Sequence, residues 1–132
     1  MNRIVQPPGW PRPKGYANGV LAEGKMLFVA GQVGWNEREE FESPDFVRQT
    51  EQALRNIVAV LTAGGAKPEH IARMTWYVID KAEYLDRLAE IGKVYKDILG
   101  AVYPAMSLVQ VAGLVEVGAK LEIEVTAVIP NA

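Results

Sequence analysis

The chain has 132 residues, a net charge of −2, 49% hydrophobic and 23% charged residues, which predicts one ordinary folded domain over residues 1–132. This slightly acidic charge provides no basic field for a phosphate backbone, so we do not expect nucleic acid as a partner. The absence of cysteine excludes disulfides, thiolate metal sites and a thiol nucleophile.

Targeting and metal signals are weak throughout the sequence. The first residues contain no apolar run typical of a signal peptide, and no stretch approaches the roughly 18 apolar residues of a membrane span. We therefore expect a cytoplasmic protein that does not contact a membrane. The one histidine, His70, lies in a predicted turn, and a lone imidazole makes neither a metal cluster nor a catalytic triad.

The N-terminal segment is rich in proline. Prolines recur through residues 1–18, and they oppose regular structure, so we expect an extended arm laid over the rest of the fold. Residues 19–33 then alternate apolar and small or polar side chains around Glu23 and Gly24. This pattern predicts a β-hairpin with its turn at that dipeptide.

A first helix is expected after the hairpin. Ser43 is a suitable N-cap, Pro44 suits the first helical position, and Asp45 complements the positive end of the helix dipole. Apolar residues in the segment 46–61 recur with helical spacing and form one stripe. Gly64 and its glycine neighbour are expected to end the helix.

A strand and a second helix follow. Residues 71–79 are rich in β-branched and aromatic side chains and are too few for a stable helix, which predicts a buried strand. Asp80 and Glu83 form a start resembling a capping box, and apolar residues recur with helical period over 84–99. Gly92 interrupts this second helix. Because a mid-helix glycine is unfavourable by about 1 kcal/mol, its presence predicts a close contact there.

Two final strands are expected at 106–112 and 119–128. The order of elements implies an α+β fold, in which a mixed sheet carries two helices on one face. The other face stays uncovered, and because the strands are apolar on both sides we expect oligomerisation to cover it. In the last strand Glu122 and Glu124 share one side and are either solvated or chemically active.

Several segments together resemble the Rid family, the reactive intermediate deaminases also called the YjgF family. The resemblance runs from Lys14 to Val128 and is carried by the segments "KGYANGV", "LFVAGQVG", "QTEQALRNIVAVLTAGGA", "MTWYVID", "VYPAMSLVQVAGL" and "AKLEIEVTAV". It implies a chorismate-mutase-like fold and a homotrimer with a ligand cleft between neighbouring subunits. Members of the best-known branch hydrolyse 2-imino or 2-enamino acids to 2-oxo acids and ammonia, without a metal or organic cofactor.

The resemblance also implies roles for particular residues. Glu122 matches the glutamate that orients or activates water, and Tyr16 matches a tyrosine that lines the cleft. Gly31 matches a glycine whose backbone contacts the ligand, and Ser107 would offer backbone or hydroxyl contacts.

Three positions depart from the pattern of the deaminases. Met106 stands where the family has an arginine that clamps the substrate carboxylate, Ala30 stands where serine is common, and Gly92 stands where asparagine is frequent. Losing both hydrogen bonds of the arginine fork would cost about 3 to 6 kcal/mol, or about a hundredfold to ten-thousandfold in affinity. We therefore expect an apolar or aromatic ligand beside Met106, and we leave open whether Arg12 or Lys14 substitutes for the clamp.

Two functions fit these observations. The first is a Rid-like deaminase acting on a reactive enamine or imine other than a simple 2-imino acid, in which one carboxyl group, Glu122, mediates both proton transfers. The second is a non-catalytic trimeric module that binds a small molecule or has a regulatory role. Ribonuclease activity is disfavoured by the acidic chain with one histidine, and chorismate mutase activity by the missing cation at Met106.

Overall fold

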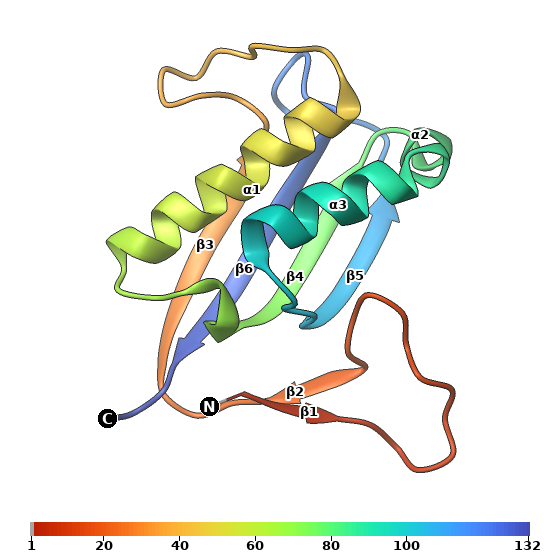
Figure 1. The fold of residues 1–132 in the computed structure, drawn as a ribbon. Coiled ribbons are helices and arrows are strands. Elements are labelled where there is room, and N and C mark those ends of the chain that lie inside the picture. Colours follow the sequence, from red (N-terminus) through yellow and green to blue (C-terminus); the bar gives the residue numbers. More distant parts are fainter. Residues whose placement is uncertain (1) are drawn as a thin grey trace.

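In the computed structural model, which describes residues 2–132, a four-stranded mixed sheet is covered by helices on one face. The strands stand in the order β3-β6-β4-β5, and a separate two-stranded sheet pairs β1 with β2. Figure 1 shows α1 and α3 side by side across the sheet. The elements are β1 Arg3–Val5, β2 Gly19–Leu21, β3 Lys25–Val33, α1 Phe46–Ala63, a 3-10 turn Pro68–His70, β4 Ile71–Val78, α2 Lys81–Asp86, α3 Leu88–Leu99, β5 Ala105–Gln110 and β6 Leu121–Ile129.

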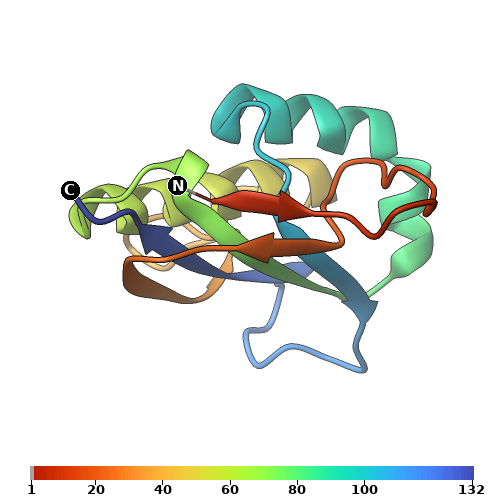
Figure 2. The ribbon, with the colours of Figure 1, turned by 90° about the horizontal axis from the view of Figure 1, so that it is seen from below.

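The expected α+β sheet with helices on one face is therefore confirmed. Strands β4 and β5 run parallel, joined by α2 and α3, while β6 lies antiparallel between β3 and β4. The helix-facing residues of the strands and the inner stripes of α1 and α3 form one apolar core. Figure 2 shows the helices on one side of the sheet and the segment between β5 and β6 on the other.

The predicted hairpin over residues 19–33 is wrong. Strand β2 pairs with β1, and β3 pairs with β6 instead. An isolated two-stranded hairpin is marginal in water, whereas the long pairing of β3 with β6 places Val29 in a core covered by α1. Gly24 has a positive φ of 148° and passes so close to Ile129 that a Cβ there would collide with its carbonyl.

The N-terminal arm is also more regular than expected. Its residues Arg3–Val5 form β1, and the prolines all fall in the loop that follows this strand. The loop returns toward the sheet, where Ala17 is buried and its N–H donates a hydrogen bond of 2.9 Å to the Pro104 carbonyl. The arm is thereby fastened beside the start of β5.

Both helix boundaries differ from the sequence prediction. Asp45, not Ser43, is the N-cap of α1, because its carboxylate accepts from Arg48 N–H at 3.1 Å while Ser43 Oγ accepts from Asp45 N–H. The predicted second helix is divided at Arg87 into α2 and α3, and Gly92 lies within α3 without interrupting it. Asp80 caps α2 as expected.

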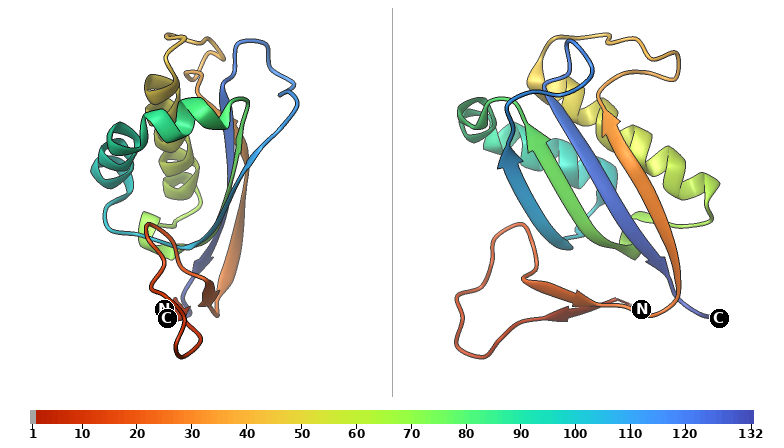
Figure 3. Two further views of the ribbon diagram at one scale, coloured as in Figure 1. Left: turned by 90° about the vertical axis from the view of Figure 1, so that its right-hand side faces the viewer. Right: turned by 180° about the vertical axis from the view of Figure 1, so that it is seen from behind.

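The uncovered face of the sheet is more polar than predicted. It exposes Met26 and Phe28 on β3, but β4 and β6 present Thr75, Tyr77 and Glu124 there. The right panel of Figure 3 shows this face from behind, with neither α1 nor α3 over it. The expectation of a sheet that is apolar on both sides is wrong, since β4 and β6 alternate buried apolar residues with polar ones.

Candidate functional site

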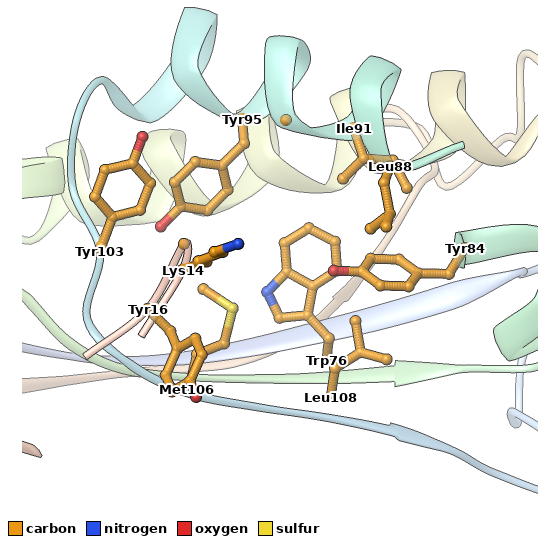
Figure 4. Close-up of a pocket in the computed structure, with 12 residues that line it drawn as sticks. Lys14, Tyr16, Trp76, Tyr84, Leu88, Ile91, Tyr95, Tyr103, Met106 and Leu108 are labelled. Atoms are coloured by element: carbon orange, nitrogen blue, oxygen red, sulfur yellow. The ribbon is translucent and has the colours of Figure 1, made fainter. Parts of the chain in front are cut away.

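A cavity of about 520 Å³ opens between α3, the helix-facing side of β4 and β5, and the returning N-terminal arm. Its walls are mostly aromatic and aliphatic, which suits an organic ligand of moderate size. Figure 4 shows the side chains converging from α3 above, from the two strands below and from the arm at one side. The lining residues are Lys14, Gly15, Tyr16, Trp76, Tyr84, Leu88, Ile91, Gly92, Tyr95, Tyr103, Met106 and Leu108.

Aromatic contacts fix the shape of this cavity. The ring of Trp76 meets that of Tyr84 edge to face, with centroids 6.3 Å apart, and lies 6.4 Å from that of Tyr95. Tyr95 in turn stacks on Tyr103 at 5.9 Å. Such pairs have preferred geometries and add to area burial, so the cavity walls are held together by side chains from four segments.

Two phenol groups of the cavity, those of Tyr84 and Tyr95, are uncharged near neutral pH. Burial raises the pKa of Tyr95 and also that of Tyr84, because the ionised form is disfavoured away from water. The Tyr95 hydroxyl donates to the Val102 carbonyl, so it is already engaged. Neither phenol is therefore a candidate anion or base at physiological pH.

Three of the expected site residues line this cavity. Tyr16 comes from the arm, Gly92 from the middle of α3, and Met106 from β5. Met106 pairs in register with Met74, whose side chain is fully buried in the core, and it is itself only partly buried. A methionine at this position thus contributes an apolar wall between the core and the open space.

Sequence reasoning missed most of the aromatic wall. Trp76 falls in the segment 71–79 that is predicted to be a buried strand, and Tyr84, Ile91 and Tyr95 fall in the segment 84–99 that is predicted to be an amphipathic helix. Periodicity correctly predicts that these residues face inward, but it does not reveal that α3 stands away from β5 at this point. The sequence feature that could have indicated this wall is the number of aromatic residues on the apolar stripe of the predicted second helix.

The other expected residues lie on the uncovered face. Glu122 alternates with the buried residues Leu121 and Ile123 of β6, so its side chain is directed away from the helices. Ser107 alternates likewise with Met106 on β5. In the register of the sheet, Ser107 and Glu124 both stand opposite Thr75.

Gly31 and Glu122 are in direct contact on this face. The register of β3 against β6 shifts between Val29 and Gln32, and Gly31 lies in this irregular stretch. A Cβ at residue 31 would collide with the Glu122 carboxylate, so any larger residue would displace it. The half-buried carboxylate is thereby seated against the backbone of β3.

Glu124 has a different environment from Glu122. Its carboxylate accepts a hydrogen bond of 2.6 Å from the Tyr77 hydroxyl, and this bond raises the pKa of Tyr77. Glu124 also lines a shallow hollow of about 380 Å³ together with Ala30, Arg73 and Thr75. Glu122 and Glu124 share one face of the sheet, as predicted, but the Glu124 carboxylate already accepts a hydrogen bond from Tyr77.

A single chain thus holds two separate groups of expected site residues. Tyr16, Gly92 and Met106 lie on the helix side of the sheet, whereas Gly31 and Glu122 lie on the opposite side. The two cations that were considered as substitutes for the clamp also differ in position. Lys14 lines the aromatic cavity, whereas Arg12 appears only among the residues of an adjoining hollow.

Residues 2–132 were also compared with the requirements of a metal site and of a membrane span. Within residues 2–132, no three His, Cys, Asp or Glu side chains are grouped as a metal site requires. Within the same range, no helix is both long and apolar enough to cross a membrane. His70 lies in the predicted turn, where its Nδ1 accepts from the Lys67 N–H at 3.0 Å.

Comparison with known proteins gives a consistent result. The model of the family described as Endoribonuclease L-PSP matches residues 11–129. A 2-iminobutanoate/2-iminopropanoate deaminase from Dermatophagoides farinae is 30% identical over 128 residues, which cover 96% of each chain.

Solved structures agree as well. YyfB of Yersinia pestis, a protein of the conserved Rid family with unknown function, matches with a TM-score of 0.83 and 32% identity, over 97% of this chain and 98% of that chain. TdcF of Escherichia coli with bound serine matches with a TM-score of 0.68 and 34% identity, over 96% of this chain and 98% of that chain.

Proposed function

Because the chain belongs to the Rid family, also called the YjgF family, we propose that it is a Rid-type deaminase of a reactive enamine or imine other than a simple 2-imino acid. The Dermatophagoides farinae relative is a deaminase of 2-imino acids, and the Escherichia coli relative binds the amino acid serine. These relatives support a small nitrogen-bearing substrate and hydrolysis of a C=N bond.

The observation that carries the proposal is the position of the Glu122 carboxylate against Gly31. That contact places one carboxyl group against the backbone of β3, where a bound water and a C=N group can meet it. Since Met106 replaces the clamping arginine, the substrate is held by apolar and aromatic walls and not by a guanidinium fork.

The proposed reaction needs one carboxyl group for both proton transfers. An enamine first takes a proton from solvent on its β-carbon and becomes an iminium ion. Water then attacks the iminium carbon while Glu122 accepts a proton from it, forming a carbinolamine. Glu122 returns the proton to nitrogen, the C–N bond breaks as the hydroxyl group releases its proton to solvent, and the products are a carbonyl compound and ammonia.

We further propose that the complete site forms between two subunits of a homotrimer. Glu122 and the cavity beside Met106 lie on opposite sides of one sheet, so a substrate in the cavity does not meet the Glu122 of the same chain. A neighbouring subunit that packs its uncovered sheet face toward the cavity would supply Glu122 and Gly31. This arrangement also covers the exposed Met26 and Phe28.

The test compares ammonia release above the spontaneous rate by the wild type and by Glu122→Gln. The substrates are conjugated imines and enamines generated in the assay from aromatic amino acids by an amino acid oxidase, with alanine as the source of a simple 2-imino acid for comparison. Glu124→Gln is the matched control, because it makes the same change two residues along the same strand. We expect Glu122→Gln to lose a factor of about 10² to 10⁴ in rate and Glu124→Gln to retain most of it. Equal rates for the wild type and Glu122→Gln would exclude the proposed role of Glu122.

The alternative is a trimeric module that binds a small molecule without turning it over. Met106, Ala30 and Gly92 favour it, since each replaces a polar group of the deaminases with an inert one. A wild type that releases no ammonia above background from any of these substrates, yet gains thermal stability in the presence of one of their stable analogues, would support this alternative.

A further inference from the structure

The indole N–H of Trp76 has no hydrogen-bond acceptor among residues 2–132, and it is the one buried side-chain polar atom there with none. Only 2% of Trp76 is exposed, although the residue lines the aromatic cavity. Figure 4 shows the indole nitrogen turned toward the open space between Lys14 and Met106. Buried donors are nearly always paired in folded proteins, so an acceptor is expected to enter from the cavity.

Lys14 points to the same end of the cavity. In Figure 4 its amine lies on the side of Trp76 that carries the indole nitrogen. No carboxylate among residues 2–132 lies within ion-pair distance of this amine. A buried N–H donor and an unpaired ammonium group at the same end of one cavity are a site for an anionic oxygen acceptor.

The rest of the cavity selects a flat and apolar ligand body. Trp76, Tyr84 and Tyr95 contribute aromatic rings to its wall, and Met106 and Leu108 add side chains with no polar atom except the thioether. Aromatic side chains prefer stacked or edge-to-face contact with another π-system. The volume of about 520 Å³ is ample for one aromatic ring with a short side chain.

We infer that Trp76 and Lys14 form a carboxylate-binding end of this cavity, and that the ligand is a conjugated or aromatic monocarboxylate whose ring lies among the tyrosines. The inference rests on the proposed function in one respect, namely that the same cavity holds the substrate. It defines that substrate as an aryl-substituted or conjugated imino or enamino acid. The carboxylate is then bound by a lysine and an indole from two segments, in place of the arginine absent at Met106.

The experiment measures binding, so that it does not depend on turnover. Three stable probes are titrated by calorimetry into the wild-type protein: trans-cinnamate, methyl cinnamate, which lacks the charge, and crotonate, which lacks the ring. We expect trans-cinnamate to bind most tightly, with each of the other two weaker by about tenfold or more. Equal affinities for trans-cinnamate and crotonate, or no binding of trans-cinnamate, would overturn the inference.

Variants then test separately whether the indole nitrogen of Trp76 and the amine of Lys14 bind the carboxylate. Trp76→Phe keeps a ring but removes the N–H and is expected to weaken trans-cinnamate binding by about tenfold to a hundredfold. Lys14→Met is expected to weaken it by about two- to fivefold and to reduce its salt dependence. Arg12→Met is the matched control on the same arm and should leave the affinity unchanged. Unchanged affinity in both Trp76→Phe and Lys14→Met would overturn the inference.

A direct readout covers the case in which Trp76→Phe does not fold. The protein has three tryptophans, so the indole resonance of Trp76 in a ¹⁵N-labelled sample is assigned by losing the other two signals in Trp10→Phe and Trp35→Phe. Its proton should move downfield on addition of trans-cinnamate, and an unmoved signal at saturation would contradict the inference. Binding without any deaminase activity would remove the proposed function alone. Turnover of a non-aromatic enamine or imine other than a simple 2-imino acid, without cinnamate binding, would remove this inference alone.

Discussion

Two glycines show how single residues define this site. A Cβ at Gly31 would meet the Glu122 carboxylate, whereas a Cβ at Gly92 would meet nothing within 4 Å. Gly92 lies within α3 and has no positive φ, so it lowers the stability of the fold only as much as an ordinary helical glycine does. The same substitution is therefore expected to act on different properties at the two positions.

Gly92→Ala should raise the free energy of unfolding by about 0.5 to 1 kcal/mol, because alanine restricts the unfolded chain and fits the open helix surface. Gly31→Ala should change stability little, since a flexible carboxylate can move aside, but it should lower ammonia release by displacing Glu122. Urea denaturation and the ammonia assay on both variants check this. Lower stability in Gly92→Ala, or full activity in Gly31→Ala, would contradict these assignments.

At this scale the sequence alone predicted only part of the site. The alternation of β6 was sufficient to put Glu122 and Glu124 on one face, and the likeness to the deaminases selected Glu122 between them. Trp76 was not selected because its alternation with Met74 and Val78 indicates burial, which a cavity wall and a core residue share. That its N–H lacks a partner among residues 2–132 depends on neighbours distant in the sequence.

At the scale of elements, Gln49 of α1 joins the helix to the start of β6. Its side chain is 1% exposed and makes three hydrogen bonds: its Nε2 donates to the carbonyls of Ser43 and Gly118, and its Oε1 accepts from Lys120 N–H. Lys120 directly precedes β6, so this glutamine fixes the strand two residues before Glu122.

Gln49→Met should reduce the free energy of unfolding by about 2 to 4 kcal/mol, because buried backbone groups lose their partners and none is replaced. Gln52→Met is the control on the same helix, since its side chain only donates to Asn56, and a change below about 0.5 kcal/mol is expected there. Urea denaturation measures both, and similar small losses in the two variants would show that Gln49 does not fix β6.

Elements with a clear local sequence pattern were predicted correctly, whereas strand pairing between residues distant in the sequence was not. Strand β4 and helix α1 appear within two or three residues of the expected limits, since their patterns are long and periodic. The hairpin prediction failed because the partner of β3 is β6, almost a hundred residues later, and local alternation carries no information on that choice. The division at Arg87 likewise had no signal in the apolar period.

At the scale of the whole molecule, the fold leaves one sheet face and one cavity open. Helices cover only one side, and the exposed Phe28 and Met26 lie on the other, where Glu122 also lies. Figure 3 shows both the open face and the segment between β5 and β6 that projects beyond it. A homotrimer with shared clefts remains our prediction, and it explains why the groups of site residues are separated within one chain.

The shared cleft is the central claim, and mixing two inactive variants tests it most directly. A Glu122→Gln chain keeps its cavity, and a Gly92→Trp chain keeps its Glu122 while the indole is expected to fill the cavity mouth. When equal amounts are refolded together, random assembly should give about one quarter of the wild-type ammonia release, because a quarter of the clefts combine two intact halves. If the mixture releases no more ammonia than the separate variants do, both halves of the site come from one chain and the account is wrong.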